Sequence, residues 1–395
     1  MQNRRASVCR WTVTFCLVLA ASIIGGALLI HGCSAGPSAR PSPASRAGPR
    51  EAESGGILYP ARVRGLYGFV DRHGAMCIPP AYEDTRGPFQ VTAAVKASGK
   101  WGFIDRSGKY IIAPAYVSAY PFSEGLAAVS VRGTEDAHGS ITGGLWGFVD
   151  AQNHMVIEAK YDVAMPFRCQ VAIVESGPDT WWIDHQARRP PDNRVHTNSR
   201  GFCEGLLPVR VEGDGYGFVD THGKMVIRPH FSAAFDFSEG LACVRARSSL
   251  PSVSGDREGY IDTAGRVVIP FVLDGGDCFS EGLATANVGG IRNMFSGFVE
   301  GGQWGYIDRT GTIVIPATFV RTLRFHEGLA FAIWDTTNWK FGLIDKCGRR
   351  VVGPTYDGVL DSFAGGVARV QIGDSECLID AHGDIVFKEI RTEVR

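Results

Sequence analysis

The sequence lacks the patterns that mark most enzymes and most metal sites. It contains no C-x-x-C pair, no cysteine and histidine cluster with metal-ligand spacing, no Gly-x-Ser-x-Gly, no His-Glu-x-x-His and no phosphate-binding loop. Its 10 histidines are scattered, so a nucleophile, a base and an orienting residue cannot be assembled from them. We therefore predict no catalytic residue, no metal and no cofactor.

An excess of charge of one sign is also missing. The chain has 40 Lys and Arg against 41 Asp and Glu, and without the three arginines of its first ten residues the balance is 37 against 41, or −4. This composition provides no basic surface for nucleic acid, so we expect no nucleic-acid partner. Glycine, by contrast, is abundant at 50 of 395 residues, which requires many turns.

One long hydrophobic run is present, close to the N-terminus. Three arginines precede the apolar residues 11–30, which predicts an export signal or membrane anchor over residues 1–32. The run ends in Ile-His-Gly-Cys, which resembles a bacterial lipoprotein processing site, so Cys33 is the candidate lipid-attachment residue. An uncleaved single-pass anchor and simple secretion are the alternatives. Residues 33–55 are rich in Ser, Pro and Ala and predict a flexible linker.

Seven cysteines follow this N-terminal segment, an odd number that cannot all pair. They fall at different positions of the repeat described next, so we interpret them as small buried hydrophobic residues. One disulfide between neighbouring repeats, such as Cys169 with Cys203, is the alternative in an oxidising compartment.

An internal repeat organises the rest of the chain. Trp-Gly-Phe-Ile-Asp at residues 101–105 recurs, strictly or loosely, in nine segments whose aspartates lie 34 to 46 residues apart. A second motif, clearest as Phe-Ser-Glu-Gly-Leu-Ala at residues 122–127, begins 17 or 18 residues after each of the first eight aspartates. Half of each unit is therefore constant in length, and the other half carries an expandable loop. The clearest copies supply these structural repeat positions: Trp101, Gly102, Asp105, Trp146, Gly147, Asp150, Trp304, Gly305 and Asp308.

Each unit has the pattern of a short antiparallel meander. Leu-Ala-x-Val and aromatic-Gly-aromatic-Ile-Asp predict two strands, Asp-x-x-Gly predicts a type I turn, and an apolar stretch before a proline predicts a third strand. We expect the strand glycine to leave a gap that a cross-strand aromatic ring covers. Glu258 and Glu376 replace the aromatic in units six and nine, where we expect imperfect cover.

The sequences KWGFIDRSGKYIIAPAY at residues 100–116 and FSEGLAAV at residues 122–129 resemble the WG (KWG) repeat family of bacterial proteins. The resemblance extends from about residue 56 to residue 386. It implies tandem β-repeat modules, often exported or attached to other domains and mostly of unassigned biochemical role. It brings no catalytic residues.

We predict an all-β tandem array of nine units, each with three or four antiparallel strands, over residues 56–386, and a C-terminal tail at 387–395. Such units are stable only when they cover one another. The array begins at the first strand of a unit and ends after the third strand of the ninth, with no unit visibly shared between its ends. We therefore expect an open curved stack, with a propeller-like ring as the alternative.

Three insertions extend the same hairpin of different units, at residues 132–145, 245–257 and 287–303, so we expect them along one edge of the array. The third contains Met294, Phe295 and Phe298, which form the candidate binding edge. The alternative is an excursion that packs on its own repeat. The glutamate of Phe-x-Glu-Gly either bonds the backbone of a neighbouring unit or lines an acidic row.

These features predict a non-enzymatic repeat protein that is exported, tethered to the membrane through its N-terminus and displayed at the cell envelope. There it would act as a scaffold that binds an envelope protein or glycan. Burial of the motif aromatics would weaken the glycan version. The alternative from another class is a polysaccharide-active hydrolase or lyase that uses a cleft of the β array.

Overall fold

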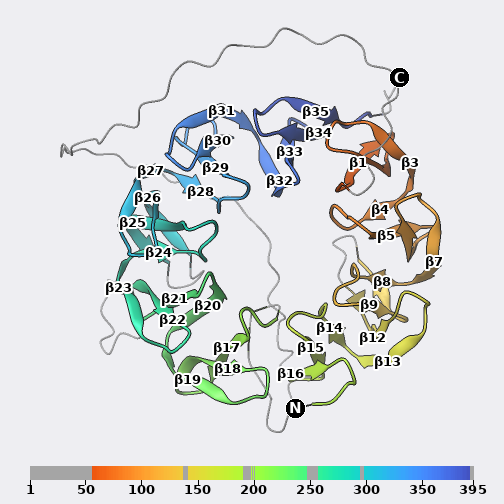
Figure 1. The fold of residues 1–395 in the computed structure, drawn as a ribbon, viewed down its shortest axis with the longest axis horizontal. Helices are drawn as coiled ribbons and strands as arrows, with labels where there is room; N and C mark the ends of the chain where they lie inside the picture. The colour runs from red at the N-terminus through yellow and green to blue at the C-terminus, as the bar shows by residue number, and fades with distance from the viewer. Residues whose placement is uncertain are drawn as a thin grey trace, which may run out of the picture. The chain divides into compact units, whose positions relative to one another are not determined.

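The computed structural model describes residues 56–136, 141–189, 197, 199, 201–246, 257–293 and 298–391. Regular secondary structure in these residues is entirely β-strand. Nine small antiparallel sheets follow one another around a ring and form a nine-bladed β-propeller (Figure 1). The predicted all-β array of nine antiparallel units is therefore confirmed. The predicted N-terminal segment, the linker, Cys33, Met294 and Phe295 lie outside the described residues.

Six blades contain four strands each, which run in chain order from the middle of the ring to its rim (Figure 1). Blade 2 contains β4 (Asp84–Thr85), β5 (Thr92–Ala97), β6 (Lys100–Asp105) and β7 (Tyr110–Tyr116). Blade 3 contains β8 (Ser118–Ala119), β9 (Ala127–Ser130), β12 (Trp146–Val149) and β13 (Met155–Tyr161). Blade 6 contains β20 (Ala233–Ser238), β21 (Leu241–Arg245), β22 (Glu258–Asp262) and β23 (Val267–Leu273).

The other three four-stranded blades complete the second half of the ring. Blade 7 contains β24 (Gly275–Gly276), β25 (Ala284–Arg292), β26 (Val299–Ile307) and β27 (Ile313–Phe319). Blade 8 contains β28 (Arg321–Thr322), β29 (Leu329–Ile333), β30 (Phe341–Asp345) and β31 (Arg350–Tyr356). Blade 9 contains β32 (Gly358–Ala364), β33 (Val367–Ile372), β34 (Ser375–Asp380) and β35 (Ile385–Lys388), so its last strand extends two residues beyond the predicted end of the array.

Three blades show three strands within the described residues. Blade 1 contains β1 (Tyr59–Val63), β2 (Leu66–Val70) and β3 (Met76–Tyr82). Blade 4 contains β14 (Val163–Ala164), β15 (Val171–Ser176) and β16 (Asp179–Asp184), and blade 5 contains β17 (Leu206–Val211), β18 (Gly215–Asp220) and β19 (Met225–Phe231). A separate hairpin of β10 (Thr134–Glu135) and β11 (Ile141–Thr142) lies in the first insertion.

Blade 2 shows how the repeat produces these strands. The alternating segment that forms β5 pairs with the Trp-Gly segment that forms β6. After β6, Asp105 accepts hydrogen bonds through Oδ1 from the backbone N–H groups of Ser107 and Lys109, at 2.8 and 3.1 Å. Gly108 closes the turn with a φ of 81°, which glycine adopts without steric cost. The Asp-x-x-Gly segment therefore forms the predicted turn, between the third strand and the outermost strand.

Glycine is required in the Trp-Gly strand for a different reason from the one expected. In blades 2 and 7 the outer strand shifts register beside this glycine, which brings a carbonyl group over it. A Cβ on Gly102 would lie 2.6 Å from the carbonyl oxygen of Ile112, and one on Gly305 would lie 2.4 Å from that of Ile315. Close backbone approach, rather than cover by an aromatic ring, thus excludes a side chain there.

Aromatic rings pack across the junctions between blades. The ring centroids of Phe103 in blade 2 and Phe122 in blade 3 are 4.7 Å apart, and those of Phe148 and Phe167 at the next junction are 4.8 Å apart. The constant half of the repeat covers this path: it leaves the third strand, turns, forms the outer strand and enters the next blade. Its length is constant because it spans a packed junction, whereas the hairpin between the second and third strands can expand.

The first and last blades contact each other, so the expected open stack is wrong and the alternative, a ring, is observed. Tyr59 donates a hydrogen bond from its hydroxyl to the carbonyl oxygen of Ala364, at 2.5 Å. The buried residues Tyr59, Val367 and Leu378 belong to one hydrophobic cluster that joins blade 1 to blade 9.

A shared element does exist at this closure, but it is very short. The N–H of Ile390 donates to the carbonyl oxygen of Arg62 in β1, at 3.1 Å. Val117 makes the corresponding bond to Ser130 where the chain passes from blade 2 into blade 3. The C-terminal residues thus join blade 1 by the same first bond that joins blade 2 to blade 3, in a segment too short to recognise from the sequence.

Candidate functional site

Each blade is an up-and-down meander, so its turns fall on two opposite faces of the ring. The hairpins between the second and third strands lie on one face, which we call the insertion face. All three insertions belong to these hairpins, in blades 3, 6 and 7. The Phe-x-Glu-Gly and Asp-x-x-Gly turns lie on the other face, which we call the turn face.

Blade 7 carries the longest described extension of the insertion face. Its strands β25 and β26 have nine residues each, whereas β24 pairs with β25 only at Ala286 and Asn287 and β27 pairs with β26 only from Trp304. Residues 288–293 and 298–303 therefore form a two-stranded ribbon beyond the blade, which we call the blade 7 ribbon.

One side of the ribbon is fixed to blade 6 by a buried carboxylate. Arg292 donates from Nη2 to Oε1 of Glu258 at 2.6 Å, and Glu258 is 1 % exposed. Arg245 donates to the same oxygen at 2.9 Å, and the N–H of Gly276 donates to Oε2 at 2.6 Å. A buried carboxylate that is paired with guanidinium groups and fully hydrogen-bonded holds its partners firmly.

The opposite side of the ribbon faces solvent. Arg292 pairs with Val299 and Ile291 pairs with Glu300, so these two pairs point to opposite sides. Ile291 is 72 % exposed and Phe298 is 57 % exposed. Beside them, Asn293 donates from Nδ2 to Oε1 of Glu300 at 2.6 Å. Two large apolar side chains with a polar border therefore stand on a fixed support.

Sequence reasoning singled out Phe298 but missed the support and Ile291. Glu258 was recognised only as a replacement for the motif aromatic, although a carboxylate in that buried position requires a cationic partner. Arg292, in the adjacent insertion, is that partner together with Arg245. The sequence did contain a signal for this support: a glutamate stands in the aromatic position of one unit, and an arginine lies in the insertion of the next.

The first insertion is fixed to its preceding blade in a similar way. Glu135 accepts hydrogen bonds through Oε2 from Nζ of Lys96 at 2.8 Å and from Nε1 of Trp101 at 3.4 Å, both in blade 2. Insertions of blades 3 and 7 therefore reach back to the motif aromatic position of the blade before. The third insertion also bonds its own blade, since Arg292 donates to the carbonyl oxygen of Asp274 at 3.0 Å.

The motif residues are built into the blades. Trp101 and Trp146 are 1 % and 5 % exposed, and Trp304 is partly buried. Asp105, Asp150 and Asp308 each bond nearby backbone N–H groups through Oδ1. The hydroxyl of Ser107 lowers the pKa of Asp105, and that of Thr310 lowers the pKa of Asp308, because both stabilise the ionised form.

On the turn face, the glutamates of Phe-x-Glu-Gly bond the backbone of the following blade. Glu281 accepts from the N–H of Gly328 at 2.9 Å, and Glu327 accepts from those of Gly365 and Gly366 at 2.6 and 2.7 Å. Of the two roles considered, bonding to a neighbouring unit is the one observed. We call this set the glutamate belt; it contains Glu124, Glu204, Glu239, Glu281 and Glu327.

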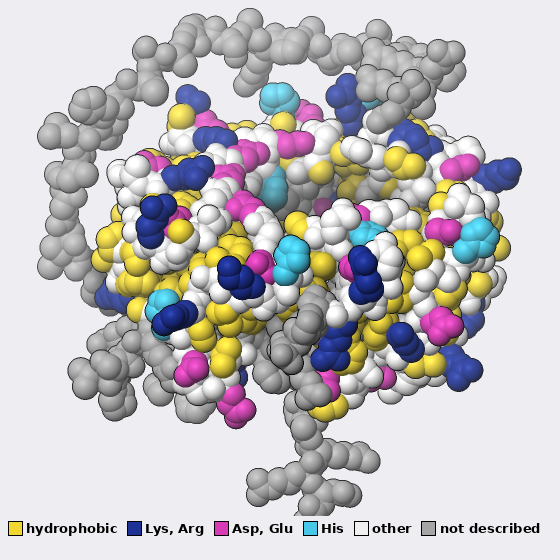
Figure 2. Space-filling model, turned by 60° about the horizontal axis from the view of Figure 1, so that its bottom comes forward, with side chains coloured by type: hydrophobic (Ala, Val, Ile, Leu, Met, Phe, Trp, Pro, Cys, Tyr) yellow, Lys and Arg dark blue, Asp and Glu magenta, His cyan; other side chains and the backbone are white. Residues whose placement is uncertain are grey.

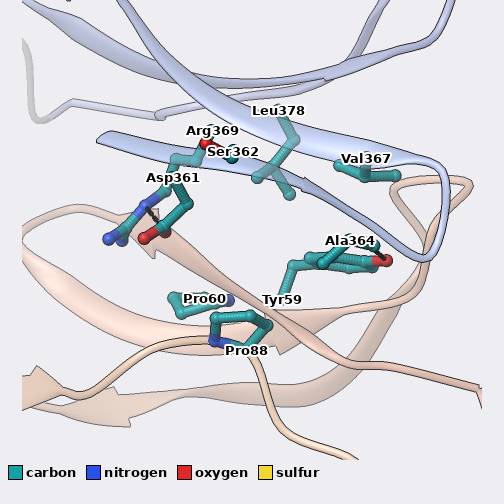
Figure 3. Close-up of a pocket in the computed structure, with 9 residues that line it drawn as sticks. All are labelled: Tyr59, Pro60, Pro88, Asp361, Ser362, Ala364, Val367, Arg369 and Leu378. Carbon is teal, nitrogen blue, oxygen red and sulfur yellow. Dashed lines mark hydrogen bonds and ion pairs between the residues drawn. The ribbon is translucent and has the colours of Figure 1, made fainter. Parts of the chain in front are cut away.

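A small pocket lies where blade 9 meets blade 1 (Figure 3). Tyr59, Pro60 and Pro88 line one side, and Asp361 and Arg369 line the other. The carboxylate of Asp361 is paired with Nε of Arg369 at 2.8 Å. The two charges of this pocket therefore offset each other, and its remaining lining is mostly apolar.

Exposed apolar residues also occur on the rim, but these follow the repeat. The outer strands of blades 2, 3, 5, 6 and 7 begin with two exposed apolar residues, such as Val267 and Val268 at 53 % and 42 % or Ile313 and Val314 at 50 % and 44 %. Figure 2 shows hydrophobic side chains mixed with basic and acidic ones over the side of the ring turned to the viewer. Because the rim pairs recur from blade to blade, they distinguish no single surface; the blade 7 ribbon does.

Two classes of site are absent from the part of the chain that the structure describes. It contains no group of three or more His, Cys, Asp and Glu side chains placed to hold a metal ion. None of its elements is a helix with the length and hydropathy needed to cross a membrane.

A family model described as "WG containing repeat" matches six segments, at residues 101–134, 146–177, 216–247, 259–290, 304–332 and 341–374. The chain contains WG repeats. Each matched WG repeat begins in the Trp-Gly strand of one blade and extends into the strand that follows the Phe-x-Glu-Gly segment of the next, so it spans a blade junction. The junctions of blade 1 with blade 2, of blade 4 with blade 5 and of blade 9 with blade 1 have no match. The search of curated proteins finds no match.

Solved structures resemble the ring in fold. A eukaryotic initiation factor aligns with a TM-score of 0.54 and 10% identity, over 85% of this chain and 96% of that one. The dihydro-heme d1 dehydrogenase NirN aligns with a TM-score of 0.43 and 12% identity, over 86% and 74% of the two chains. BamB from Moraxella catarrhalis aligns with a TM-score of 0.36 and 14% identity, over 87% and 94%. Only the first score supports the propeller fold, and none bears on activity.

Proposed function

We propose that this WG-repeat propeller is a non-enzymatic scaffold that binds a protein partner through the blade 7 ribbon. The observation that carries the proposal is the pair of exposed side chains, Ile291 and Phe298, on a ribbon whose other side is fixed by a buried ion pair. Exposed apolar groups on a rigid, non-repeated support are typical of protein contact sites, because little ordering entropy is lost on binding.

A protein partner is favoured over a glycan by the burial of the motif aromatics. Sugar recognition would use exposed aromatic faces, whereas Trp101 and Trp146 are buried inside their blades. An enzymatic cleft would need converging carboxylates, and Asp361 in the closure pocket is neutralised by Arg369. Both points support a binding role on the insertion face over an enzymatic role in the closure pocket.

The proposed location is the cell envelope. The apolar run at residues 11–30 and the Ile-His-Gly-Cys segment support export followed by lipid attachment at Cys33. Growth of the producing cells with an alkyne-labelled fatty acid tests this: we expect label on the intact protein and none on Cys33→Ala. Equal labelling of both would refute lipidation at this residue.

Site-specific photo-crosslinking tests the binding surface. A photoreactive phenylalanine analogue at position 291 is compared with one at position 267, where the native valine is 53 % exposed on the rim of blade 6. We expect a discrete protein adduct from position 291 only, and its loss when Phe298→Ser is added. The same adducts from both positions, or adducts insensitive to Phe298→Ser, would contradict the proposal. Binding to cell-wall glycan that survives these changes would instead support the glycan version.

A further inference from the structure

The junction between blades 4 and 5 departs from the glutamate belt. Cys169 occupies the position that Glu124 has in blade 3, with a φ of 50° against 52°. It lies in the same tight turn, since Arg168 bridges to Val171 as Ser123 bridges to Leu126. Glu124 bonds blade 3 to the backbone of blade 4. A cysteine cannot form that charged bond from blade 4 to blade 5.

The thiol at this position donates a hydrogen bond to the peptide group that precedes a second cysteine in the next blade. Sγ of Cys169 lies 3.4 Å from the carbonyl oxygen of Phe202, and Cys203 is the residue bonded to that carbonyl. Standard backbone geometry places the Cα of Cys203 about 2.8 Å from that oxygen, and so within about 6 Å of the Cys169 sulfur. This is within the reach of disulfide geometry after side-chain rotation.

Both cysteines are free thiols in this structure and neither is fully buried: Cys169 is exposed and Cys203 is partly buried. The two blades are already packed at this point. The rings of Trp182 and Phe202 are 5.2 Å apart, and Nε1 of Trp182 donates to the carbonyl oxygen of Thr221 at 3.0 Å. A bond between the two sulfurs would therefore add a covalent link to a junction that is already packed.

We propose that Cys169 and Cys203 form a disulfide that latches blade 4 to blade 5 where the glutamate belt is interrupted. The oxidant is a low-molecular-weight disulfide. The Cys169 thiolate attacks it, which forms a mixed disulfide and releases one small thiol. The Cys203 thiolate then attacks the Cys169 sulfur and releases the second. Two protein thiols are oxidised, one small disulfide is reduced to two thiols, and the two protein protons pass to the released thiolates.

The order of attack follows from the environments of the two thiols. Burial raises the pKa of Cys203 to about 11, which keeps it protonated at neutral pH. Cys169 is exposed and meets the small disulfide first. The second step is intramolecular, so proximity compensates for the small thiolate fraction of Cys203.

Equilibration of the reduced full-length protein with mixtures of reduced and oxidised glutathione tests the proposal. Free thiols are then alkylated and the digest is analysed by mass spectrometry. We expect a linked peptide that joins Cys169 to Cys203 and increases with the oxidised fraction. We also expect the oxidised protein to melt about 5 °C higher than the reduced one, because the bond closes a loop of roughly 34 residues in the unfolded chain.

Single-cysteine variants provide the controls. Cys169→Ser and Cys203→Ser should each abolish both the linked peptide and the redox-dependent melting shift, while Cys347→Ser, which removes an exposed thiol in blade 8, should retain both. Mixed disulfides with glutathione and no linked peptide would overturn the proposal, as would linkage of Cys203 to Cys278. A linked peptide without a melting shift would overturn the latch.

Discussion

Replacing Arg292 with alanine tests whether the buried carboxylate of Glu258 holds the blade 7 ribbon. The substitution removes one of two guanidinium partners from a side chain that is 1 % exposed. Complete loss of the partner of a buried charge costs about 3–5 kcal/mol. Glu258 keeps its bonds from Arg245 and from the N–H of Gly276, so we expect about 2 kcal/mol, near the value for one hydrogen bond to a charged group.

This loss should be local before it is global, because Arg292 joins the ribbon to blade 6 rather than closing a strand ladder. Hydrogen exchange distinguishes local from global destabilisation: a local loss of about 2 kcal/mol accelerates exchange of the ribbon amides roughly 30-fold. The reporter is the N–H of Asn293, which donates to the carbonyl oxygen of Phe298 at 2.8 Å. Amides of the neighbouring β22 should change little.

Arg266→Ala is the matched control. It removes an arginine from the β22–β23 turn of blade 6, on the turn face away from the ribbon, whose ion pair with Asp262 is 2.7 Å long but leaves the arginine side chain 82% exposed. Such a surface pair contributes at most about 1 kcal/mol, so ribbon exchange should stay at the native rate. If Arg292→Ala leaves ribbon exchange unchanged, or if Arg266→Ala accelerates it equally, the ion pair does not hold the ribbon.

Three further predictions concern the repeat itself. Glu327→Gln should lower the urea midpoint of unfolding, with a loss of about 1–2 kcal/mol in the free energy of unfolding, because the carboxylate accepts hydrogen bonds from two backbone N–H groups of the next blade. An unchanged midpoint would show that this bond of the glutamate belt does not stabilise the ring. Gly305→Ala should cost about 3 kcal/mol in the same assay because its Cβ would meet backbone at 2.4 Å, whereas Gly353→Ala, which meets nothing within 4 Å, should cost far less; equal costs would contradict the close-approach account. Ser107→Ala should raise the pKa of Asp105 toward 3.8, as followed by carboxyl NMR titration. Because the pKa of Asp105 is depressed in the folded state, the ionised carboxylate stabilises the fold above pH 3.8, and this stabilisation is lost as pH falls through the folded pKa. The variant should lose it at a higher pH. An Asp105 pKa that does not change in the variant would exclude the Ser107 hydroxyl bond as the cause of the shift.

Local chemistry made the blade predictable from its residues. The turn at Asp105 depends on an aspartate that bonds nearby N–H groups and on a glycine with positive φ, both of which are set within five residues. The strands on either side follow from period-two alternation. The nine units, their antiparallel order and the single face for the insertions follow from these local rules and the spacing of the motif.

Contacts between distant parts of the chain were not predictable in this way. Ring closure depends on the angle between blades, which accumulates over nine junctions, and on a bond from Ile390 to Arg62 that lies across the whole sequence. The support of the ribbon depends on Arg292 reaching Glu258, 34 residues earlier, over a bend that no local pattern encodes. Repetition of short-range turn and strand chemistry thus determines the blade, whereas the long-range geometry of the assembled ring decides which side chains of the insertions are buried as anchors and which are exposed for a partner.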